Sequence, residues 1–358
     1  MSDSQDSRPD QGGARNEGES IVVIANPQAG GGRAGARRSE IEAGVARAFA
    51  HSRVLWTEHA GHATVLARQV AEQAARDGEA PIIAALGGDG TCHEVVNGLF
   101  VDGVPVHRRV VFAVLPFGTG GDLVRTLQVK KNLQDALWVA STGMTLPLDV
   151  IKLTFPARGA GPARGAGTSL IGVRSEICIN VVGFGINARV CELANKSAKR
   201  FGGTATFLSS ILRALRTFEP VPVTWSWDGP DGPGGVTMET HAAFCANGQY
   251  CGAGLFVGKG GSMADGVLDL SIVPKMAALN AIRHLPKLYS GDFNMVPGVV
   301  QARVTRVEVS SAIPVETDGE SIGDAPVVIE VLPRSLMVRG GWLKPPFSVP
   351  DRPEATET

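Results

Sequence analysis

The chain alternates short apolar runs with amphipathic stretches from residue 21 to about residue 146. The apolar runs have the length of strands that are buried on both faces of a parallel sheet, and they cover 21–26, 53–57, 81–86 and 109–116. The amphipathic stretches carry apolar residues at helical spacing, and they cover 36–50, 62–77 and 94–100. This succession predicts an α/β domain with an open parallel sheet and helices on both faces.

The pattern changes after Leu148, where strand-like segments follow one another with glycine-rich turns between several of them. These segments cover 149–155, 174–184, 223–227, 241–248, 268–274 and 303–311. Helical stretches interrupt them at 190–218 and 277–291. The second half of the chain is therefore predicted to be a mainly antiparallel β domain.

Both ends of the chain are polar, so 1–20 is predicted to be a disordered leader and 346–358 a loose tail. The repeat ARGAGPARGAG at 157–167 predicts a mobile loop. No apolar run approaches the roughly 20 residues that span a bilayer, and the leader lacks the apolar core of a signal peptide. We therefore expect a cytoplasmic protein with reduced cysteines.

Charge and composition narrow the function. The sequence has 34 Lys and Arg against 35 Asp and Glu, which argues against a nucleic-acid partner. Glycine is the unusual residue, with 45 among 358 positions, where about 7% is typical. Three glycine-rich loops follow three predicted strands, and they cover 26–33, 87–91 and 116–122. Since ligands bind at the carboxyl ends of strands in open parallel sheets, and glycine exposes backbone N–H groups, these loops indicate a phosphate site.

A dinucleotide-binding enzyme is the alternative interpretation of the first loop. Residues 30–35 read GGGRAG and match G-x-G-x-x-G, with Glu58 placed where a ribose-binding acid would lie. Pro27 and the long approach to Gly30 weaken this match, and GGDGT has no role in such a site. The P-loop and the protein-kinase motifs are both absent from the sequence.

Two acidic segments lie in the second half. Glu316, Asp318 and Glu320 alternate along the chain, so on an extended strand they would share one face and form a general base or a metal site. Asp265 lies in a turn where main-chain carbonyls would complete a Mg²⁺ or Ca²⁺ site, although a plain hairpin loop gives the same pattern.

With these motifs assembled, the chain resembles the diacylglycerol kinase catalytic-domain family, which includes bacterial lipid kinases, sphingosine kinases and ceramide kinases. The motif GGDGT-x-x-E at 87–94 is the most specific mark. It is supported, in the family's order, by NPQAGGG (26–32), PFGTGGDLVR (116–125), CANGQYCGAG (245–254), ADGVLDL (264–270) and TDGES (317–321). Gly121 departs from the family pattern, which usually has Asn there.

The resemblance implies an NAD kinase-like fold. A nucleotide-binding α/β domain would comprise 21–147 and a returning strand at about 327–345, and a β-sandwich lipid-substrate domain would comprise 148–326. ATP would contact Asn26, Pro27, Gln28, Ala29, Gly30, Thr57, Gly88, Asp89, Gly90, Thr91, Glu94 and Thr119. Asp265, with main-chain oxygens of Ser262 and Val267, matches a structural Mg²⁺ position. Glu320 matches the proton acceptor, with Asp318 and Asp89 as supporting acids.

These observations together predict an ATP-dependent lipid kinase that transfers the γ-phosphate to a hydroxyl of a membrane lipid, such as diacylglycerol, ceramide or a sphingoid base. An NAD kinase or another dinucleotide-binding enzyme is the alternative. We expect peripheral association with the inner membrane face, through the basic residues Lys196, Lys199, Arg200, Arg213 and Arg216. A homodimer is left open.

Overall fold

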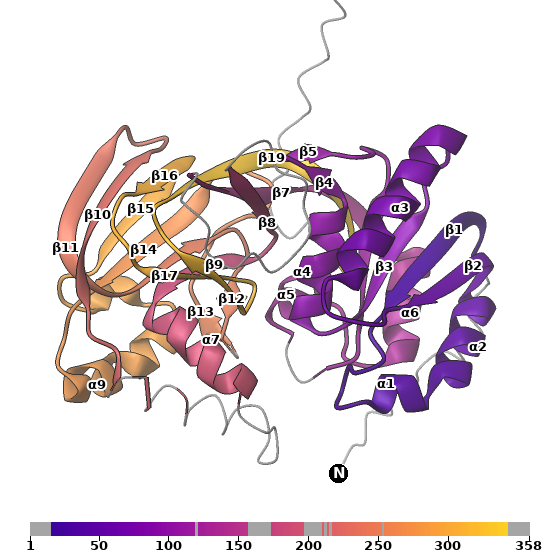
Figure 1. Cartoon of the computed structure of the whole chain (residues 1–358), viewed down its shortest axis with the longest axis horizontal. Coiled ribbons are helices and arrows are strands. Elements are labelled where there is room, and N and C mark those ends of the chain that lie inside the picture. The colour runs from indigo at the N-terminus through magenta and orange to yellow at the C-terminus, as the bar shows by residue number, and fades with distance from the viewer. Residues whose placement is uncertain are drawn as a thin grey trace, which may run out of the picture.

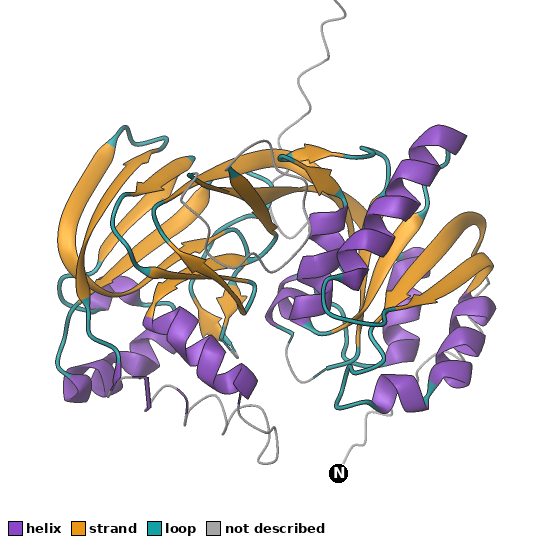
Figure 2. Cartoon of the chain, in the orientation of Figure 1, coloured by secondary structure: helices purple, strands orange, loops and turns teal. Residues whose placement is uncertain are grey.

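The computed structural model describes residues 16–118, 121–156, 173–196, 210, 213–214, 217–252 and 254–342. Two domains lie side by side and are joined by long strands along one edge (Figures 1 and 2). The first half of the chain forms the α/β domain, and the second half forms the β-rich domain. The arrangement agrees with the predicted fold class of an α/β domain followed by an antiparallel β domain.

The α/β domain has a central parallel sheet in the strand order β2-β1-β3-β6. These strands are β1 (Asn16–Ala25), β2 (Phe49–Trp56), β3 (Ile82–Gly87) and β6 (Val111–Pro116). The helices are α1 (Arg33–Ala36), α2 (Arg38–Ala48), α3 (His62–Asp77), α4 (Asp89–Gly98), α5 (Asp122–Thr126) and α6 (Leu133–Thr142). A short hairpin is formed by β4 (Phe100–Val101) and β5 (Val104–Pro105).

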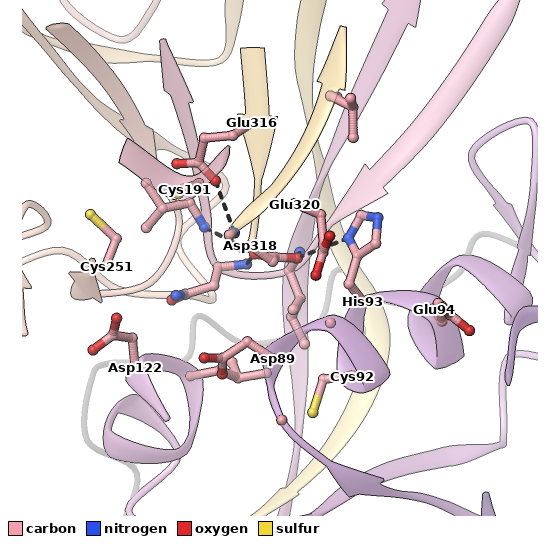
Figure 3. A pocket seen from close by; sticks show the side chains of 18 of the residues that line it. Asp89, Cys92, His93, Glu94, Asp122, Cys191, Cys251, Glu316, Asp318 and Glu320 are labelled. Carbon is pink, nitrogen blue, oxygen red and sulfur yellow. Dashed lines mark hydrogen bonds and ion pairs between the residues drawn. The ribbon is translucent and has the colours of Figure 1, made fainter. Parts of the chain in front are cut away.

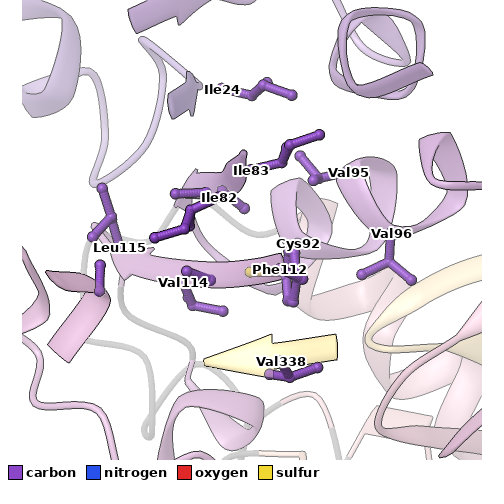
Figure 4. Packing of buried hydrophobic residues seen from close by; sticks show 14 of the residues in the cluster. Ile24, Ile82, Ile83, Cys92, Val95, Val96, Phe112, Val114, Leu115 and Val338 are labelled. Atoms are coloured by element: carbon purple, nitrogen blue, oxygen red, sulfur yellow. The ribbon is translucent and has the colours of Figure 1, made fainter. Parts of the chain in front are cut away.

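Continuous apolar runs explain the position of β3 at the centre of this sheet. All its residues from Ile82 to Gly87 are buried, because helices cover both faces of the sheet. Figure 4 shows Ile82 and Ile83 of β3 among the side chains of β6 and α4, including Phe112 and Val95. The rigid core thus fixes the carboxyl ends of the strands, where the glycine loops begin.

Three expectations about this domain were wrong in detail. Residues 16–20 belong to β1 rather than to a disordered leader, because Glu19 forms a 2.8 Å ion pair with Arg339 of the returning strand. The second strand begins at Phe49, where the backbone becomes extended and ends α2. Helix α4 begins at Asp89 and not at Glu94, so the helix starts inside the GGDGT motif itself.

The β-rich domain is antiparallel throughout the pairings that the described residues form. Its strands are β8 (Arg174–Cys178), β9 (Val181–Gly185), β10 (Val221–Asp228), β11 (Gly234–Ala246), β12 (Tyr250–Cys251), β13 (Leu255–Phe256), β14 (Leu268–Pro274), β15 (Val300–Val304), β16 (Arg306–Val309), β17 (Pro314–Thr317) and β18 (Glu320–Asp324). Its helices are α7 (Ile186–Lys196), α9 (Ala278–Tyr289) and the 3-10 turn η1 (Phe293–Met295). Phe184 and Trp225 pack edge to face in its core, with ring centroids 5.1 Å apart.

Two long strands connect the domains, β7 (Met144–Phe155) and β19 (Val327–Gly340). β19 runs antiparallel to β7 and β16, and its end lies parallel to β6 of the first domain. The register of β19 against β7 shifts between Leu332 and Leu336. Asp149 lies fully buried at this shift and accepts hydrogen bonds from the backbone N–H groups of Gly266 and Arg334 at 2.8 and 2.7 Å. One carboxylate therefore fastens the irregular part of the connection.

Candidate functional site

A cavity of about 2820 Å³ lies between the two domains. Its walls include the glycine loops of the α/β domain on one side and α7, α9 and the β17–β18 hairpin on the other. The predicted site residues of both domains, apart from those at the predicted metal position, therefore face one space. Thr119 is a predicted nucleotide contact that falls outside the described residues.

The first loop has a conformation that requires glycine. Gly30, Gly31 and Gly32 follow one another with φ angles of 63°, 71° and 85°. Three successive left-handed residues are costly for any side chain with a Cβ atom. Asn26 fixes the loop from its beginning, because its Oδ1 accepts from the backbone N–H of Gln28 at 2.8 Å, and its Nδ2 donates to Thr91 Oγ1 at 3.3 Å. The first and second loops are thus joined.

Asp89 joins the second loop to the third. Its Oδ2 accepts a hydrogen bond from the backbone N–H of Gly121 at 3.1 Å. Burial raises the pKa of Asp89 to about 7, and the nearby carboxylates of Asp122 and Asp318 add to this, while the Gly121 N–H and Lys131 oppose it. The site therefore concentrates negative charge that a cation arriving with a substrate would relieve.

Gly121, which departs from the family pattern, is explained by its backbone conformation. It has a φ of 142°, and a Cβ atom built on it would lie 2.7 Å from Cε of Lys131 and 3.0 Å from its Nζ. Lys131 lines the cavity. The positive φ angle disfavours any L side chain at 121, whereas the flexible end of Lys131 can shift, so the backbone conformation is what favours glycine here.

Glu94 has a structural contact that the sequence pattern did not show. Its carboxylate accepts hydrogen bonds from the backbone N–H groups of Gly61 and Ala63, at 2.9 and 3.1 Å. These groups lie at the N-terminus of α3, where backbone donors lack partners within the helix. Glu94 also borders the cavity, but its two oxygens are occupied by the helix. These hydrogen bonds favour a role of Glu94 as an anchor of the loop before α3 over a direct contact to ATP.

The acidic segment at 316–320 forms a hairpin and not one extended strand. Asp318 and Gly319 have φ angles of 51° and 89° and form the two-residue turn between β17 and β18. The expectation that Glu316, Asp318 and Glu320 share one face was therefore wrong, because the Asp-Gly pair reverses the chain. Figure 3 shows the three carboxylates pointing in different directions.

The three acids of this hairpin have separate environments. Glu316 is 4% exposed, and burial raises its pKa to about 8, although its hydrogen bond from the Gly319 N–H at 2.9 Å opposes this. Asp318 is also buried, whereas Glu320 is exposed to the cavity. A Cβ atom built on Gly90 would lie 2.6 Å from Oε1 of Glu320, so the GGDGT loop and this carboxylate approach each other closely.

Asp318 is surrounded by hydrogen-bond donors. Its carboxylate accepts from the thiol of Cys178 at 3.1 Å and from the backbone N–H groups of Ile179, Asn180 and Val181 at 3.0 to 3.3 Å. Burial would raise the pKa of Asp318, but the hydrogen bond and charge of His93 outweigh it and lower the pKa. Asp318 therefore ties the hairpin to the β8–β9 turn, and Glu320 is the most exposed of the three carboxylates at 316–320.

His93 is a functional candidate that the sequence motifs do not indicate. Its Nε2 lies 2.9 Å from Glu176 Oε1, and its Nδ1 lies 3.4 Å from Asp318 Oδ2. Burial opposes a charge on this ring, yet Asp318 and Glu176 outweigh it and raise the pKa of His93 to about 10. A buried imidazolium thus links α4 to β8 and the hairpin. His93 stands at an unspecified position of GGDGT-x-x-E, and Glu176 is far away in sequence, so no local pattern indicates the pair.

The predicted metal position contains a cationic side chain. Asp265 Oδ2 accepts a hydrogen bond from Nη2 of Arg303 at 2.8 Å, and its Oδ1 accepts from the backbone N–H of Val267 at 3.2 Å. The Ser262 hydroxyl accepts from the Ala264 N–H. No group of three or more His, Cys, Asp or Glu side chains suited to a metal ion occurs within the described residues. Arg303 thus engages one oxygen of Asp265, and the metal position, which relies on main-chain oxygens of Ser262 and Val267, stays a prediction.

The wall of the cavity in the β-rich domain is apolar. Ile186 and Val190 of α7, Phe244 of β11, and Leu285 and Leu288 of α9 line it. His241 lies in this wall, 7% exposed, and neither of its ring nitrogens has a hydrogen-bond partner. Burial lowers the pKa of His241, so its ring is neutral near pH 7. The cavity therefore combines a polar side at the loops with an apolar side opposite.

An α/β domain with three glycine loops, facing an acidic hairpin across a large cavity, defines a two-domain kinase. The comparisons agree with this class. The family model for the diacylglycerol kinase catalytic domain matches residues 20–153, and the model for the YegS C-terminal NAD kinase beta sandwich-like domain matches residues 180–340. The chain therefore contains a diacylglycerol kinase catalytic domain followed by a YegS-type C-terminal domain, and it is an enzyme of the kinase class.

Individual relatives are distant but cover most of the chain. A protein of Yersinia pestis (strain Pestoides F) named "Probable lipid kinase YegS-like" is 24% identical over 296 residues, which are 81% of this chain and 86% of its own length. A crystal structure of a diacylglycerol kinase from Bacillus anthracis str. Sterne is 21% identical, with a TM-score of 0.62. A second structure from that organism is 24% identical, with a TM-score of 0.68. Each structural match covers 90% of this chain and 97% of the other, which supports the fold.

Proposed function

We propose that the protein transfers the γ-phosphate of ATP to a hydroxyl group of a membrane lipid. The observation that carries this proposal is the composition of the cavity between the domains. Its polar side is built from the GGDGT loop and its partners, and its opposite side is built from apolar side chains of α7, β11 and α9. A long-chain alcohol needs both surfaces, because its hydroxyl must reach the phosphate while its chain leaves water.

The nucleotide is proposed to lie against the first two loops. The backbone N–H groups of Gly30 to Gly32 and the N-terminus of α4 at Gly88 offer hydrogen-bond donors to phosphate oxygens. Asp89 with Asp122 would provide the carboxylates for a magnesium ion that accompanies ATP. Such an ion would neutralise charge on the phosphates, as in other phosphoryl transfers.

Glu320 is proposed to orient and deprotonate the lipid hydroxyl. It is the exposed carboxylate of the hairpin and lies against Gly90 at the start of α4. The hydroxyl oxygen would then attack the γ-phosphorus in line with the leaving ADP oxygen. Phosphoryl transfer depends mainly on positioning and electrostatics, so Glu320 and the loop donors are sufficient for this chemistry.

The test is transfer of radiolabelled phosphate from ATP to a panel of diacylglycerol, ceramide, sphingosine and phosphatidylglycerol, with NAD as a further acceptor. We expect one lipid to be labelled and Glu320→Gln to lose at least about a hundredfold in turnover while still binding ATP. Asp324→Asn, at the other end of β18, is the matched control and should retain activity. Labelling of NAD alone would overturn the proposal in favour of an NAD kinase, and normal turnover of Glu320→Gln would remove its role.

A further inference from the structure

Helix α9 is amphipathic but buries none of its residues. Its inner face, with Ala281, Leu285 and Leu288, lines the apolar side of the cavity. Its outer face contains Leu279, Arg283 and Lys287 at i, i+4 and i+8, and Ile282 lies at the border between this face and the cavity. The inner face has its role in the cavity wall, whereas the outer face has no partner in the fold as described.

The outer face is unusually apolar for a free surface. Leu279 is 77% exposed, the largest value among the exposed large hydrophobic residues that the structure describes. Ile282 is 44% exposed, and Met295 of the adjacent η1 turn is 57% exposed. Lys287 of α9 holds η1 in place, because its Nζ donates to the carbonyl oxygen of Met295 at 3.0 Å. We call Leu279, Ile282, Arg283 and Met295 the α9 surface.

The positive charge of α9 favours an anionic bilayer over a second copy of the protein as the partner of this surface. α9 contains Arg283, His284 and Lys287 and has no Asp or Glu. Arg283 is exposed and forms none of the ion pairs found among the described residues. An apolar stripe bordered by cations is typical of helices that lie in the interface of an anionic bilayer. A second copy of the same cationic surface would instead repel it.

We propose that the α9 surface docks on an anionic phospholipid bilayer and places the apolar wall of the cavity next to the acyl chains. The proposal rests on the proposed function, since only a lipid-using enzyme needs its substrate wall at a bilayer. No helix that the structure describes is long and apolar enough to cross a membrane. Among the residues expected from sequence to approach the membrane, Arg213 is described and exposed, whereas the side chains of Lys196, Lys199, Arg200 and Arg216 lie outside the description. The α9 surface is therefore a separate candidate.

The test measures binding of the full-length protein, without ATP, to vesicles of phosphatidylcholine mixed with phosphatidylglycerol and to vesicles of phosphatidylcholine alone. The variant is Leu279→Glu with Met295→Glu, which leaves Ile282 unchanged because that residue also lines the cavity. The matched control is Val104→Glu with Trp138→Glu, two exposed apolar residues that do not line the cavity. We expect wild type to favour the anionic vesicles, and the α9 variant to lose at least about tenfold in partition while the control keeps it.

Several results would overturn the docking proposal. These are equal partition of wild type and the α9 variant, no binding of wild type to the anionic vesicles, and equal losses in the two variants. Conversion of a dimer to a monomer by the α9 variant, with unchanged vesicle binding, would assign the surface to self-association instead. Phosphorylation of a short-chain diacylglycerol dispersed in water requires no bilayer, so this assay tests the proposed kinase function separately from docking by the α9 surface. If no lipid is phosphorylated but the α9 variant still loses vesicle binding, the function fails and the docking surface stands.

Discussion

The buried imidazolium of His93 gives a quantitative prediction about stability. In the folded protein its pKa is raised from 6.5 to about 10 by Asp318 and Glu176. A group whose pKa is raised by folding contributes its full stability below the unfolded pKa and loses it as the pH rises through the folded pKa. The shift corresponds to about 5 kcal/mol at low pH, in the range of the 3–5 kcal/mol that breaking a buried ion pair costs.

The perturbation is His93→Gln, which keeps a polar side chain but removes the charge. Between pH 7 and pH 9.5 the wild type should lose about 3 kcal/mol of this contribution, and the variant should lose none of it. Urea unfolding of both proteins across this range measures the difference, and titrations of groups that do not interact with His93 cancel in the comparison. Glu316 is the exception, because the charge of His93 lowers its pKa, which lies at about 8. His51→Gln, at an exposed position of β2, is the control.

Two outcomes decide the reasoning about His93. A gap between wild type and variant that narrows as the pH rises supports a charged ring in the folded state. A gap that stays constant from pH 7 to pH 9.5 would refute it, because a neutral ring contributes packing and hydrogen bonds that do not titrate there. Turnover at pH 7 offers a second readout, since the hairpin held by His93 also carries Glu320.

Two further substitutions test contacts at the loops. Glu94→Ala should lower the free energy of unfolding measured in urea by about 1–2 kcal/mol, because two backbone donors at the N-terminus of α3 lose their acceptor. The control Glu79→Ala should leave the free energy unchanged. An unchanged urea midpoint for Glu94→Ala would contradict its anchoring role. Lys131→Gln should raise the KM for ATP roughly tenfold with a smaller change in kcat, because the substitution removes a cation that faces Asp89. The neighbouring Lys130→Gln is the control and should have the KM of the wild type. An equal KM in the two variants would exclude a nucleotide contact by Lys131.

The sequence allowed the α/β domain to be predicted closely because each of its elements has a local pattern. Buried strands such as β3 are continuous apolar runs, and α3 has regular helical spacing. The motifs also fixed which loops face the cavity, since strand ends in a parallel sheet converge. The predicted element boundaries that were wrong depended on contacts between residues distant in the chain. An example is β1, which begins at Asn16 and in which Glu19 pairs with Arg339.

The roles within the acidic segment were not predictable from spacing. Alternation treats Glu316, Asp318 and Glu320 as equivalent, but the Asp-Gly turn gives each a different environment. The buried pair of His93 and Glu176 was also invisible, because it depends on α4 of one domain facing β8 of the other. Only the folded structure shows that the carboxylate of Asp318 already accepts several hydrogen bonds from the protein.

These hydrogen bonds distinguish Asp318, which holds the hairpin, from Glu320, which we propose as the reacting acid. Asp318 accepts from the Cys178 thiol, from the backbone of the β8–β9 turn and from His93, so its pKa is lowered and its oxygens are engaged by the protein. The same contacts fix the turn from which Glu320 extends toward Gly90. Since Gly90 belongs to α4, and His93 lies one turn further along that helix, a single helix sets both the nucleotide loop and the hairpin. Their alignment across the cavity is therefore built into the core of the enzyme.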